Sequence, residues 1–243
     1  NRPGFAGGDR TSIELPQVQR DILKALKKAG KKVVFVNCSG SAVALVPEME
    51  SCDAILQAWY PGQSGGLAVA DVLFGDFNPS GKLPVTFYRN TDQLPDFEDY
   101  SMKNRTYRYM TEAPLFPFGY GLSYTTFDIS KGRLNKKTIS AGQGLNFKVN
   151  VKNTGKYDGA EVVQVYVRKV DDTEGPIKSL RAFRRVPLKA GETCVVSIDL
   201  LPTTFEFFDP TTNTMRIMPG KYEIMYGNSS DVPSGNKLSV TLR

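Results

Sequence analysis

The spacing of apolar residues changes near residue 127, and this change constrains the fold more than any other feature of the sequence. Before it, apolar runs of strand length alternate with stretches of helical spacing. After it, short segments alternate apolar and polar residues and are separated by turn residues. The first pattern is typical of βαβ units in a mostly parallel sheet, and the second of an antiparallel sandwich. The sequence therefore predicts an α/β part followed by an all-β part.

Two longer helices are predicted in the α/β part, and Ser39, Gly40 and Ser41 could cap a short helix between them that Pro47 ends. Residues 16–29 carry apolar side chains at helical spacing, with Pro16 suited to the first turn and Gly30 to the stop. Residues 67–74 are almost all apolar and are followed by Gly75, so they predict a second helix. The apolar face expected on the first helix consists of Val18, Ile22, Ala25, Leu26 and Ala29.

Three strands are predicted around these helices. Residues 31–37 contain a continuous β-branched run of the kind found in the middle of a parallel sheet, and residues 53–59 form a second run. Residues 82–88 are expected to be a third strand, at a sheet edge because Pro84 has no N–H to donate. Three strands make a small sheet, so we expect the remaining strands of this part to lie upstream of residue 1.

Seven or eight short alternating segments follow residue 127, which predicts an immunoglobulin-like or fibronectin type III-like β-sandwich. Three regions are therefore expected: residues 1–88 as the carboxy-terminal part of an α/β sandwich domain, 89–126 as an aromatic-rich interdomain connector, and 127–243 as the β-sandwich. The expected strands are residues 145–151, 160–168, 180–188, 194–200, 204–208, 214–217, 222–226 and 238–242.

The connector is rich in aromatic residues, among them Phe116, Phe118 and Tyr120. A flexible Gly/Ser linker would not have this composition. One interpretation is that these rings form an interdomain core. The other is that they stack on sugars, because an aromatic face matches the apolar face of a pyranose.

The residue types that are rare in the chain exclude several kinds of chemistry. There is no histidine, which rules out Ser-His-Asp catalysis, Cys-His catalysis and histidine metal sites within these 243 residues. The three cysteines predict packed free thiols, with a Cys38–Cys52 disulfide as the alternative for two of them and Cys194 left over.

Charge and hydropathy argue against nucleic-acid and membrane partners. The formal net charge is +6, and its basic excess is spread along the alternating segments of the second half, as on a solvated sheet face. No apolar run approaches the ~20 residues of a membrane helix. No basic-then-apolar leader opens the chain, so no signal peptide is expected in it.

Several long motifs resemble glycoside hydrolase family three. Three segments resemble the second domain of that family: WYPGQSGGLAVADVLFGDFNPSGKLPVTF (59–87), GGDRTSIELPQVQ (7–19) and PLFPFGYGLSYTTF (114–127). The fibronectin type III-like domain that follows it in many members is resembled by VNVKNTGKYDGAEVVQVYV (149–167) and PIKSLRAFRRVPLKAGE (176–192). The resemblance covers nearly the whole chain and is nearest to bacterial β-glucosidases and β-xylosidases.

The resemblance implies that the chain is the carboxy-terminal part of a retaining exo-acting β-glycosidase. In that family the nucleophile is an Asp in an amino-terminal TIM barrel, and the acid/base is typically a Glu shortly before the segment matching GGDR. Retaining hydrolysis needs these two carboxyl groups ~5–5.5 Å apart, and the resemblance places both outside this chain, so no catalytic residue is assigned to it.

The same resemblance sets the expected partners. They are a β-linked oligosaccharide and the missing amino-terminal TIM barrel of the same protein. No metal and no organic cofactor are implied, since this hydrolysis needs only carboxylates and water. A periplasmic or secreted location is favoured by the resemblance alone.

Five residues are expected to bind substrate or to support the site: Phe5, Gly8, Asp9, Arg10 and Trp59. The first four lie in the segment that follows the expected acid/base loop. Asp9 and Arg10 are interpreted as a structural ion pair that holds this loop, with substrate contact as the alternative. Trp59 follows a predicted strand, where α/β sheets place ligand loops, and either forms a cleft wall or packs in a strand-to-helix turn.

The other acidic residues have no convincing acid/base role. Glu48, Glu50, Glu98 and Asp99 are interpreted as solvated loop charges, and Glu14 precedes the first helix. The alternative function is a non-catalytic carbohydrate-binding or scaffolding module. Against it, the half-sheet cannot cover itself without its missing strands, and burial is worth ~25 cal/mol per Å² of apolar surface.

Overall fold

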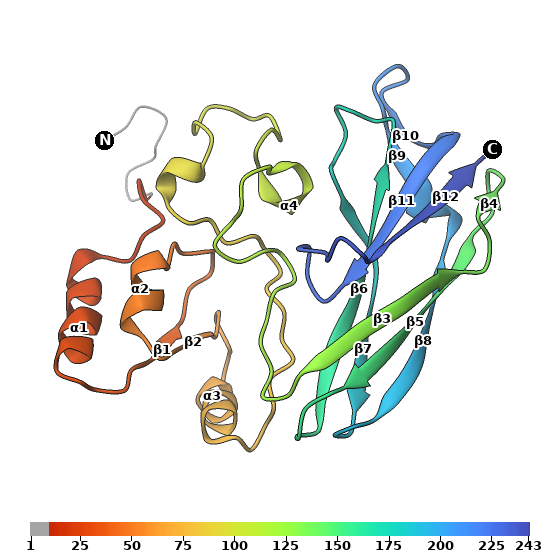
Figure 1. Ribbon diagram of the computed structural model, residues 1–243. Coiled ribbons are helices and arrows are strands. Elements are labelled where there is room, and N and C mark those ends of the chain that lie inside the picture. Colours follow the sequence, from red (N-terminus) through yellow and green to blue (C-terminus); the bar gives the residue numbers. More distant parts are fainter. Residues whose placement is uncertain (1–9) are drawn as a thin grey trace. The chain divides into compact units, whose positions relative to one another are not determined.

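The structure is a computed structural model that describes residues 10–243 and divides into two compact units (Figure 1). The first, the α/β unit, contains the chain up to residue 77 together with residues 85–106 and 110–117. The second, the sandwich unit, contains residues 78–84, 107–109 and 118–243. The chain therefore passes between the units five times, and both units draw on the region predicted as a connector.

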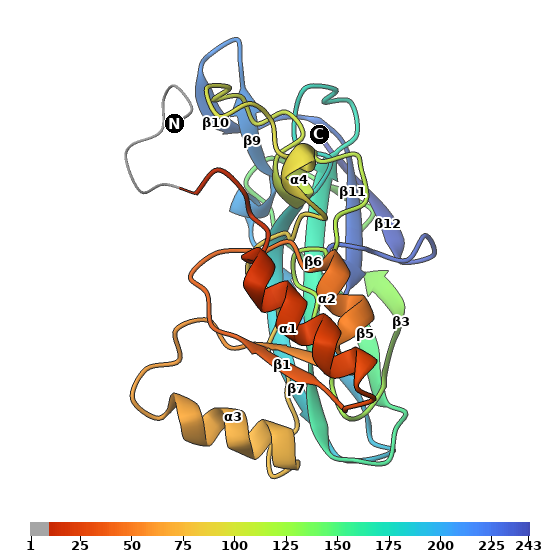
Figure 2. The same cartoon turned by 90° about the vertical axis from the view of Figure 1, so that its left-hand side faces the viewer.

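The α/β unit contains a two-stranded parallel sheet. Strand β1 (Val34–Asn37) pairs with β2 (Ala54–Gln57), with Val34 opposite Ala54. Helices α1 (Gln17–Lys28) and α2 (Val46–Ser51) lie side by side, and α3 (Gly65–Phe74) follows β2 (Figure 2). These elements confirm the two longer predicted helices and the first two predicted strands. The short helix expected to end at Pro47 is wrong, because α2 begins at Val46 and Pro47 stands in its first turn.

The remaining helical elements of the chain are short. They are the 3₁₀ turn η1 (Thr91–Gln93) and helix α4 (Thr106–Tyr109), followed in the sandwich by η2 (Pro202–Phe205). No helix in residues 10–243 is long and apolar enough to cross a membrane.

The predicted third strand at residues 82–88 is wrong. Its backbone pairs with a distant segment at separate points only: the Leu83 amide donates to the Tyr120 carbonyl at 2.8 Å, and the Gly119 amide donates to the Leu83 carbonyl at 2.8 Å. Pro84 then interrupts the pairing because it has no N–H. Phe87 forms only an isolated bridge with Phe116.

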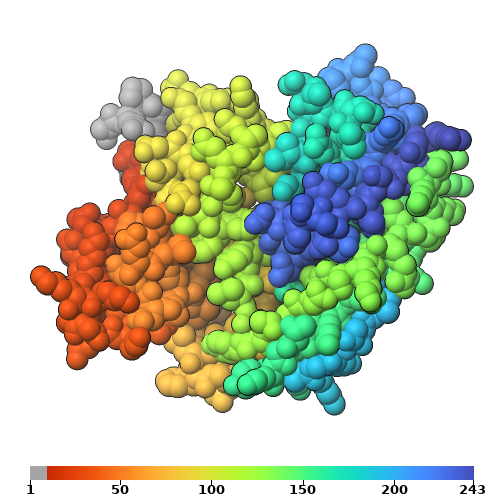
Figure 3. Space-filling model, in the orientation of Figure 1, coloured from red at the N-terminus to blue at the C-terminus, as the bar shows by residue number. Residues whose placement is uncertain are grey.

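Helix α1 buries a different side from the one predicted. Of its residues only Leu23 is buried, in a small cluster with Val33 and Cys52. Three members of the expected apolar face are exposed, with Val18 at 66%, Ile22 at 56% and Leu26 at 41%. The red atoms of this helix lie at the surface of the α/β unit in Figure 3. The period of the pattern identified the helix, but nothing in the described residues covers its apolar stripe.

The sandwich unit consists of two sheets and a hairpin. Five strands run in the order β4-β12-β11-β6-β7, three in the order β3-β5-β8, and β9 pairs with β10. The strands are β3 (Phe127–Leu134), β4 (Thr138–Ile139), β5 (Leu145–Asn153), β6 (Gly159–Lys169), β7 (Ser179–Leu188), β8 (Thr193–Leu200), β9 (Glu206–Asp209), β10 (Thr214–Ile217), β11 (Gly220–Gly227) and β12 (Lys237–Leu242).

Alternation along the strands builds the core of this unit. On β5, Phe147, Val149 and Val151 are fully buried, whereas Lys148 and Lys152 between and beyond them are exposed. The inward residues of the other strands, such as Val165 and Ile224, complete one apolar cluster. The predicted succession of an α/β part and an all-β sandwich is confirmed.

The cysteines are free thiols, as predicted, and no Cys38–Cys52 disulfide forms, but the predicted packing is wrong for Cys38. Cys52 is buried, Cys194 is partly buried and Cys38 is exposed.

Candidate functional site

Two of the five predicted site residues lie in the described part of the chain. Phe5, Gly8 and Asp9 fall outside it. Arg10 is exposed, and its Nη2 donates to the Ser41 hydroxyl at 2.6 Å. Among the residues that the structure describes, its side chain bonds this hydroxyl and no carboxylate.

Trp59 lies just after β2, as predicted, in a conformation unusual for a residue with a side chain. Its φ of 57° lies in the left-handed region that favours glycine. Its half-buried ring meets the ring of Phe87 edge-on, with 6.1 Å between centroids. Such strain persists only where the surroundings impose it, and the edge-on contact with buried Phe87 is one such constraint.

Segment 10–14 is fixed by hydrogen bonds that converge on Thr91, an arrangement we call the Glu14 latch. The Glu14 carboxylate accepts from the Thr91 amide at 2.8 Å, from the Thr91 hydroxyl at 2.6 Å and from the Ser12 hydroxyl. The Ile13 amide donates to the Thr91 hydroxyl oxygen at 3.1 Å. The latch therefore ties the start of the described chain to η1, which lies 77 residues further along.

The protonation state of Glu14 follows from these bonds. Partial burial alone would raise the pKa of this carboxyl, but hydrogen bonds from Ser12 and Thr91 outweigh it and lower the pKa to about 2. A general acid needs a pKa near the working pH. Glu14 is consequently an anchor that stays ionised.

Glu48 is not the solvated charge that the sequence suggested. It is 1% exposed, and its Oε1 lies 3.1 Å from Nε of Arg20, so that the pair joins α2 to α1. Glu48 Oε2 and Arg20 Nη2 have no hydrogen-bond partner within residues 10–243. The interpretation failed because Glu48 lies in α2, which begins at Val46 with Pro47 in its first turn, and the helix buries this side chain.

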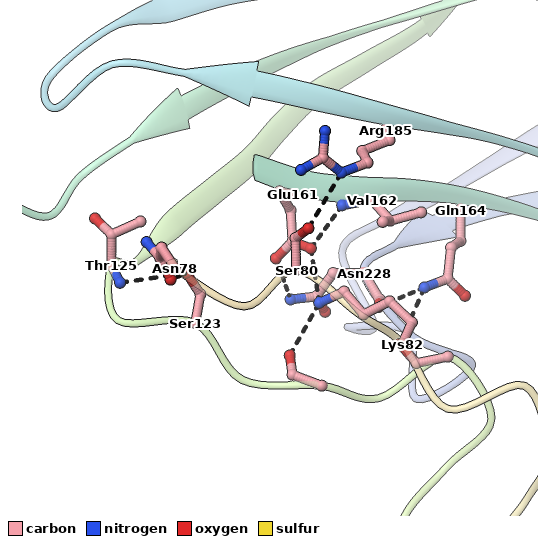
Figure 4. Close-up of polar contacts among 12 residues, drawn as sticks. Asn78, Ser80, Lys82, Ser123, Thr125, Glu161, Val162, Gln164, Arg185 and Asn228 are labelled. Carbon is pink, nitrogen blue, oxygen red and sulfur yellow. Dashed lines mark hydrogen bonds and ion pairs between the residues drawn. The ribbon is translucent and has the colours of Figure 1, made fainter. Parts of the chain in front are cut away.

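The sandwich unit holds a second polar centre, the Lys82 cluster, formed by Asn78, Ser80, Lys82, Glu161 and Asn228 (Figure 4). The Lys82 ammonium lies 2.7 Å from Glu161 Oε1 and donates to the Gly121 carbonyl at 2.9 Å. Asn228 donates to the other carboxylate oxygen at 3.0 Å. The side chains of Lys82 and Glu161 are 12% and 6% exposed, so this is a largely buried and well-satisfied ion pair.

The neighbours of Lys82 attach the same segment to other parts of the sandwich unit. Arg185 Nε donates to the Ser80 hydroxyl at 3.1 Å, and Asn78 Nδ2 donates to the Asp158 carbonyl at 2.9 Å. The Lys82 cluster thus joins residues 78–84 to β6 and β7. The sequence reasoning missed it, although Lys82 stands in the motif NPSGKLPVTF and Glu161 interrupts the apolar alternation of β6.

Neither centre brings together groups for metal binding. Within residues 10–243 no set of three or more Cys, Asp or Glu side chains is arranged to hold a metal ion. The polar groups of the Glu14 latch and of the Lys82 cluster hold backbone segments in place.

Two family models match the chain. The model described as the glycosyl hydrolase family 3 C-terminal domain matches residues 4–124. The model of a fibronectin type III-like domain matches residues 161–230.

Curated relatives match over nearly the whole chain. A xylan 1,4-β-xylosidase of Xylanibacter ruminicola is 61% identical over 242 residues, which are 100% of this chain and 28% of that protein. A periplasmic β-glucosidase of Salmonella typhimurium is 41% identical over 93% of this chain and 31% of that protein. The chain therefore spans less than a third of the length of these relatives.

Solved structures share the fold. A β-glucosidase of Bifidobacterium adolescentis superposes with a TM-score of 0.86 at 34% identity, over 98% of this chain and 37% of that one. A Listeria innocua β-glucosidase, solved in complex with isofagomine, gives a TM-score of 0.83 at 32% identity, over 98% and 35% of the two chains.

Proposed function

This chain belongs to glycoside hydrolase family 3, as its C-terminal domain followed by a fibronectin type III-like domain, and from this membership we propose that it is the carboxy-terminal part of a retaining exo-acting β-glycosidase. The proposed substrates are oligosaccharides with terminal β-linked xylosyl or glucosyl units. They follow from the names of the relatives, a β-xylosidase and a β-glucosidase. The proposed nucleophile and acid/base lie in the remainder of the protein.

The uncovered apolar surface of the α/β unit is the observation that supports this proposal best. Helix α3 is almost entirely apolar, yet Leu67 is 66% and Phe74 84% exposed. Val18 and Ile22 on α1 are also exposed, at 66% and 56%, and gathered apolar side chains at a surface mark sites of interaction. We propose that the rest of the protein, including the amino-terminal TIM barrel, packs against them.

The state of the described carboxylates agrees with a catalytic pair elsewhere. Retaining hydrolysis requires one carboxylic acid that holds a proton and one carboxylate that attacks. Glu14 is held ionised by the latch, and Glu48 and Glu161 are each committed to a buried ion pair. None of the three is disposed to act as a general acid.

The test compares the 243-residue chain with the longer protein that contains it, on aryl β-xyloside and aryl β-glucoside. We expect turnover by the longer protein and none by the chain alone. Turnover by the chain alone that Glu14→Gln or Asp9→Asn abolishes would overturn the assignment. A chain that binds oligosaccharide, in a longer protein that hydrolyses none, would support the alternative of a carbohydrate-binding module.

A further inference from the structure

The α/β unit contains a cavity of about 200 Å³ that the Glu14 latch does not use. It is lined by residues of the segment that follows Thr91, from Asp92 to Glu112. Drug-sized ligands occupy pockets of ~300–1,000 Å³, so this cavity is suited to a smaller molecule, of the size of one sugar ring.

The lining combines an apolar floor with a polar rim. Leu94, Pro95 and Met110 supply the floor, and Met110 is only 8% exposed. The exposed lining residues form the rim and carry both kinds of hydrogen-bonding group: the carboxylates of Asp92, Asp99 and Glu112 accept, and the ammonium of Lys103 donates. Acceptors and donors around an apolar floor are complementary to a neutral ligand with many hydroxyl groups and one apolar face.

The rim has hydrogen-bonding capacity left for a ligand. Within residues 10–243, the side chains of Asp92, Lys103 and Asn104 have neither a hydrogen bond nor an ion pair. Gln93, in contrast, is fixed as part of the wall. Its amide nitrogen donates to Glu112 Oε2 at 3.3 Å and to the Ala113 carbonyl at 3.2 Å, and its oxygen accepts from the Arg89 amide at 2.8 Å.

The latch places this cavity beside the start of the described chain. Thr91 bonds Ile13 and Glu14, and the next two residues, Asp92 and Gln93, line the cavity. Segment 10–14 continues the segment that is expected to follow the acid/base loop, and the acid/base protonates the oxygen of the leaving group. A substrate bound there would extend toward the cavity on its leaving-group side.

We propose that this cavity is a sugar subsite, which takes one pyranose unit of a β-linked oligosaccharide on the leaving-group side of the bond that is cleaved. The proposal rests on the proposed function for the direction of the substrate, but the binding of a sugar does not depend on turnover. The unit in the cavity is one beyond the leaving group that disaccharides and aryl glycosides also provide, so occupation of the cavity gives the enzyme a preference for longer substrates over both.

The test uses the longer protein that contains this chain, with variants Lys103→Ala and Glu112→Gln. Loss of a hydrogen bond to a charged group is worth ~1.5–3 kcal/mol, which is about a tenfold or greater change. We expect each variant to lower kcat/KM for β-1,4-linked tetrasaccharides about tenfold and to leave kcat/KM for the aryl glycoside unchanged. Xylotetraose and cellotetraose are both used as probes.

Matched controls and a binding measurement separate the two proposals. Glu98→Gln alters a carboxylate of the same segment that does not line the cavity, and Lys136→Ala removes an exposed lysine of the sandwich unit, so both should behave as wild type. Calorimetric titration with non-hydrolysable thio-linked tetrasaccharides measures affinity without turnover. Weaker binding by Lys103→Ala and Glu112→Gln supports the subsite whether or not the protein hydrolyses a glycoside. A protein that binds in this way but hydrolyses no glycoside would refute the proposed function and leave the subsite supported.

Other outcomes overturn the subsite. Unchanged affinity in both variants would do so, whether or not the enzyme is active. Equal losses on the tetrasaccharide and the aryl glycoside, with normal melting temperatures, would show that the residues support the enzyme generally and do not recognise an added sugar.

Discussion

Glu14 illustrates how local hydrogen bonds decide what a carboxylate does. In the sequence it is one of several acidic residues near a segment of functional interest. Its partner Thr91 lies far along the chain, so neither spacing nor periodicity could have revealed the latch. The same applies to Glu48 and Arg20, because the burial of a charge depends on which helix faces pack together.

The latch predicts a defined pH dependence of stability. The pKa of Glu14 is lowered to about 2 in the folded chain, and a glutamate in an unfolded chain has a pKa of ~4.3. The stabilisation is therefore complete above the unfolded pKa and is lost as pH falls from about 5 to about 2. Glu14→Gln should reduce the free energy of unfolding at pH 7, and its difference from wild type should shrink across this window.

Urea unfolding of both proteins at several pH values measures this difference. Glu50→Gln is the control, since Glu50 is exposed and its substitution should have little effect at any pH. A difference between wild type and Glu14→Gln that stays constant between pH 7 and pH 2 would contradict the role of the ionised latch.

Removal of Lys82 should be the most damaging single charge change in the sandwich unit. Lys82→Met leaves Glu161 buried without its cation, and breaking a buried pair by deleting one partner costs ~3–5 kcal/mol. The double variant Lys82→Met/Glu161→Leu should recover part of this loss, because no unpaired charge remains. Chemical denaturation measures both variants, with Lys136→Met as the exposed control. Equal stabilities of Lys82→Met and the control would show that the pair contributes nothing.

Among the elements, the spacing of apolar residues predicted whether a segment is a helix or a strand better than it predicted which side of that element is buried. Helices α1 and α3 and strands β1 and β2 were all predicted from local spacing. Which side of α1 is covered depends on neighbours that local spacing does not identify. The supposed third strand failed because Pro84 has no N–H, so the pairing of Leu83 with residues 119 and 120 does not continue as a ladder.

Helix α1 provides a prediction about what covers its exposed stripe. Ile22 is 56% exposed, so Ile22→Lys in the 243-residue chain should change stability by less than ~0.5 kcal/mol and should reduce self-association. In the longer protein, the same change should cost about 2 kcal/mol or more, because a charge would be buried at a packed interface. Light scattering and thermal melting compare the two. Gln19→Lys, at an exposed polar position of the same helix, is the control and should be neutral in both proteins.

At the scale of the whole molecule, the boundary between the units differs from what a linear reading of the sequence suggests. The change of period near residue 127 marks where the strands begin. It gives no sign that residues 78–84 and 107–109 also belong to the sandwich unit. Those residues join it through contacts such as Lys82 with Glu161, and through the Tyr107 ring, which stacks on Phe118 at 4.4 Å.

A fragment that starts at residue 78 should therefore be more stable than one that starts at residue 127. The shorter fragment lacks Ser80, Lys82 and Tyr107, so the contacts of these residues with β6, β7 and Phe118 are lost, the ion pair with Glu161 included. Circular dichroism and urea unfolding of the two fragments check this. Equal stability would mean that the sandwich fold is complete without the upstream segment.

The assignment of residues 78–84 and 107–109 to the sandwich unit affects the order in which the chain folds. Residues 85–106, which carry most of the cavity, enter and leave the α/β unit through Pro84 and Tyr107, and both of these belong to the sandwich unit. Once Leu83 has paired with Tyr120 and Tyr107 has stacked on Phe118, the two ends of this segment are tethered. The entropy of closing that loop, which grows as ~(3/2)RT ln n, is then already lost. A sandwich of long-range contacts is slow to form. We therefore expect that the strands assemble first and that their assembly limits the rate at which the cavity wall in residues 85–106 becomes ordered.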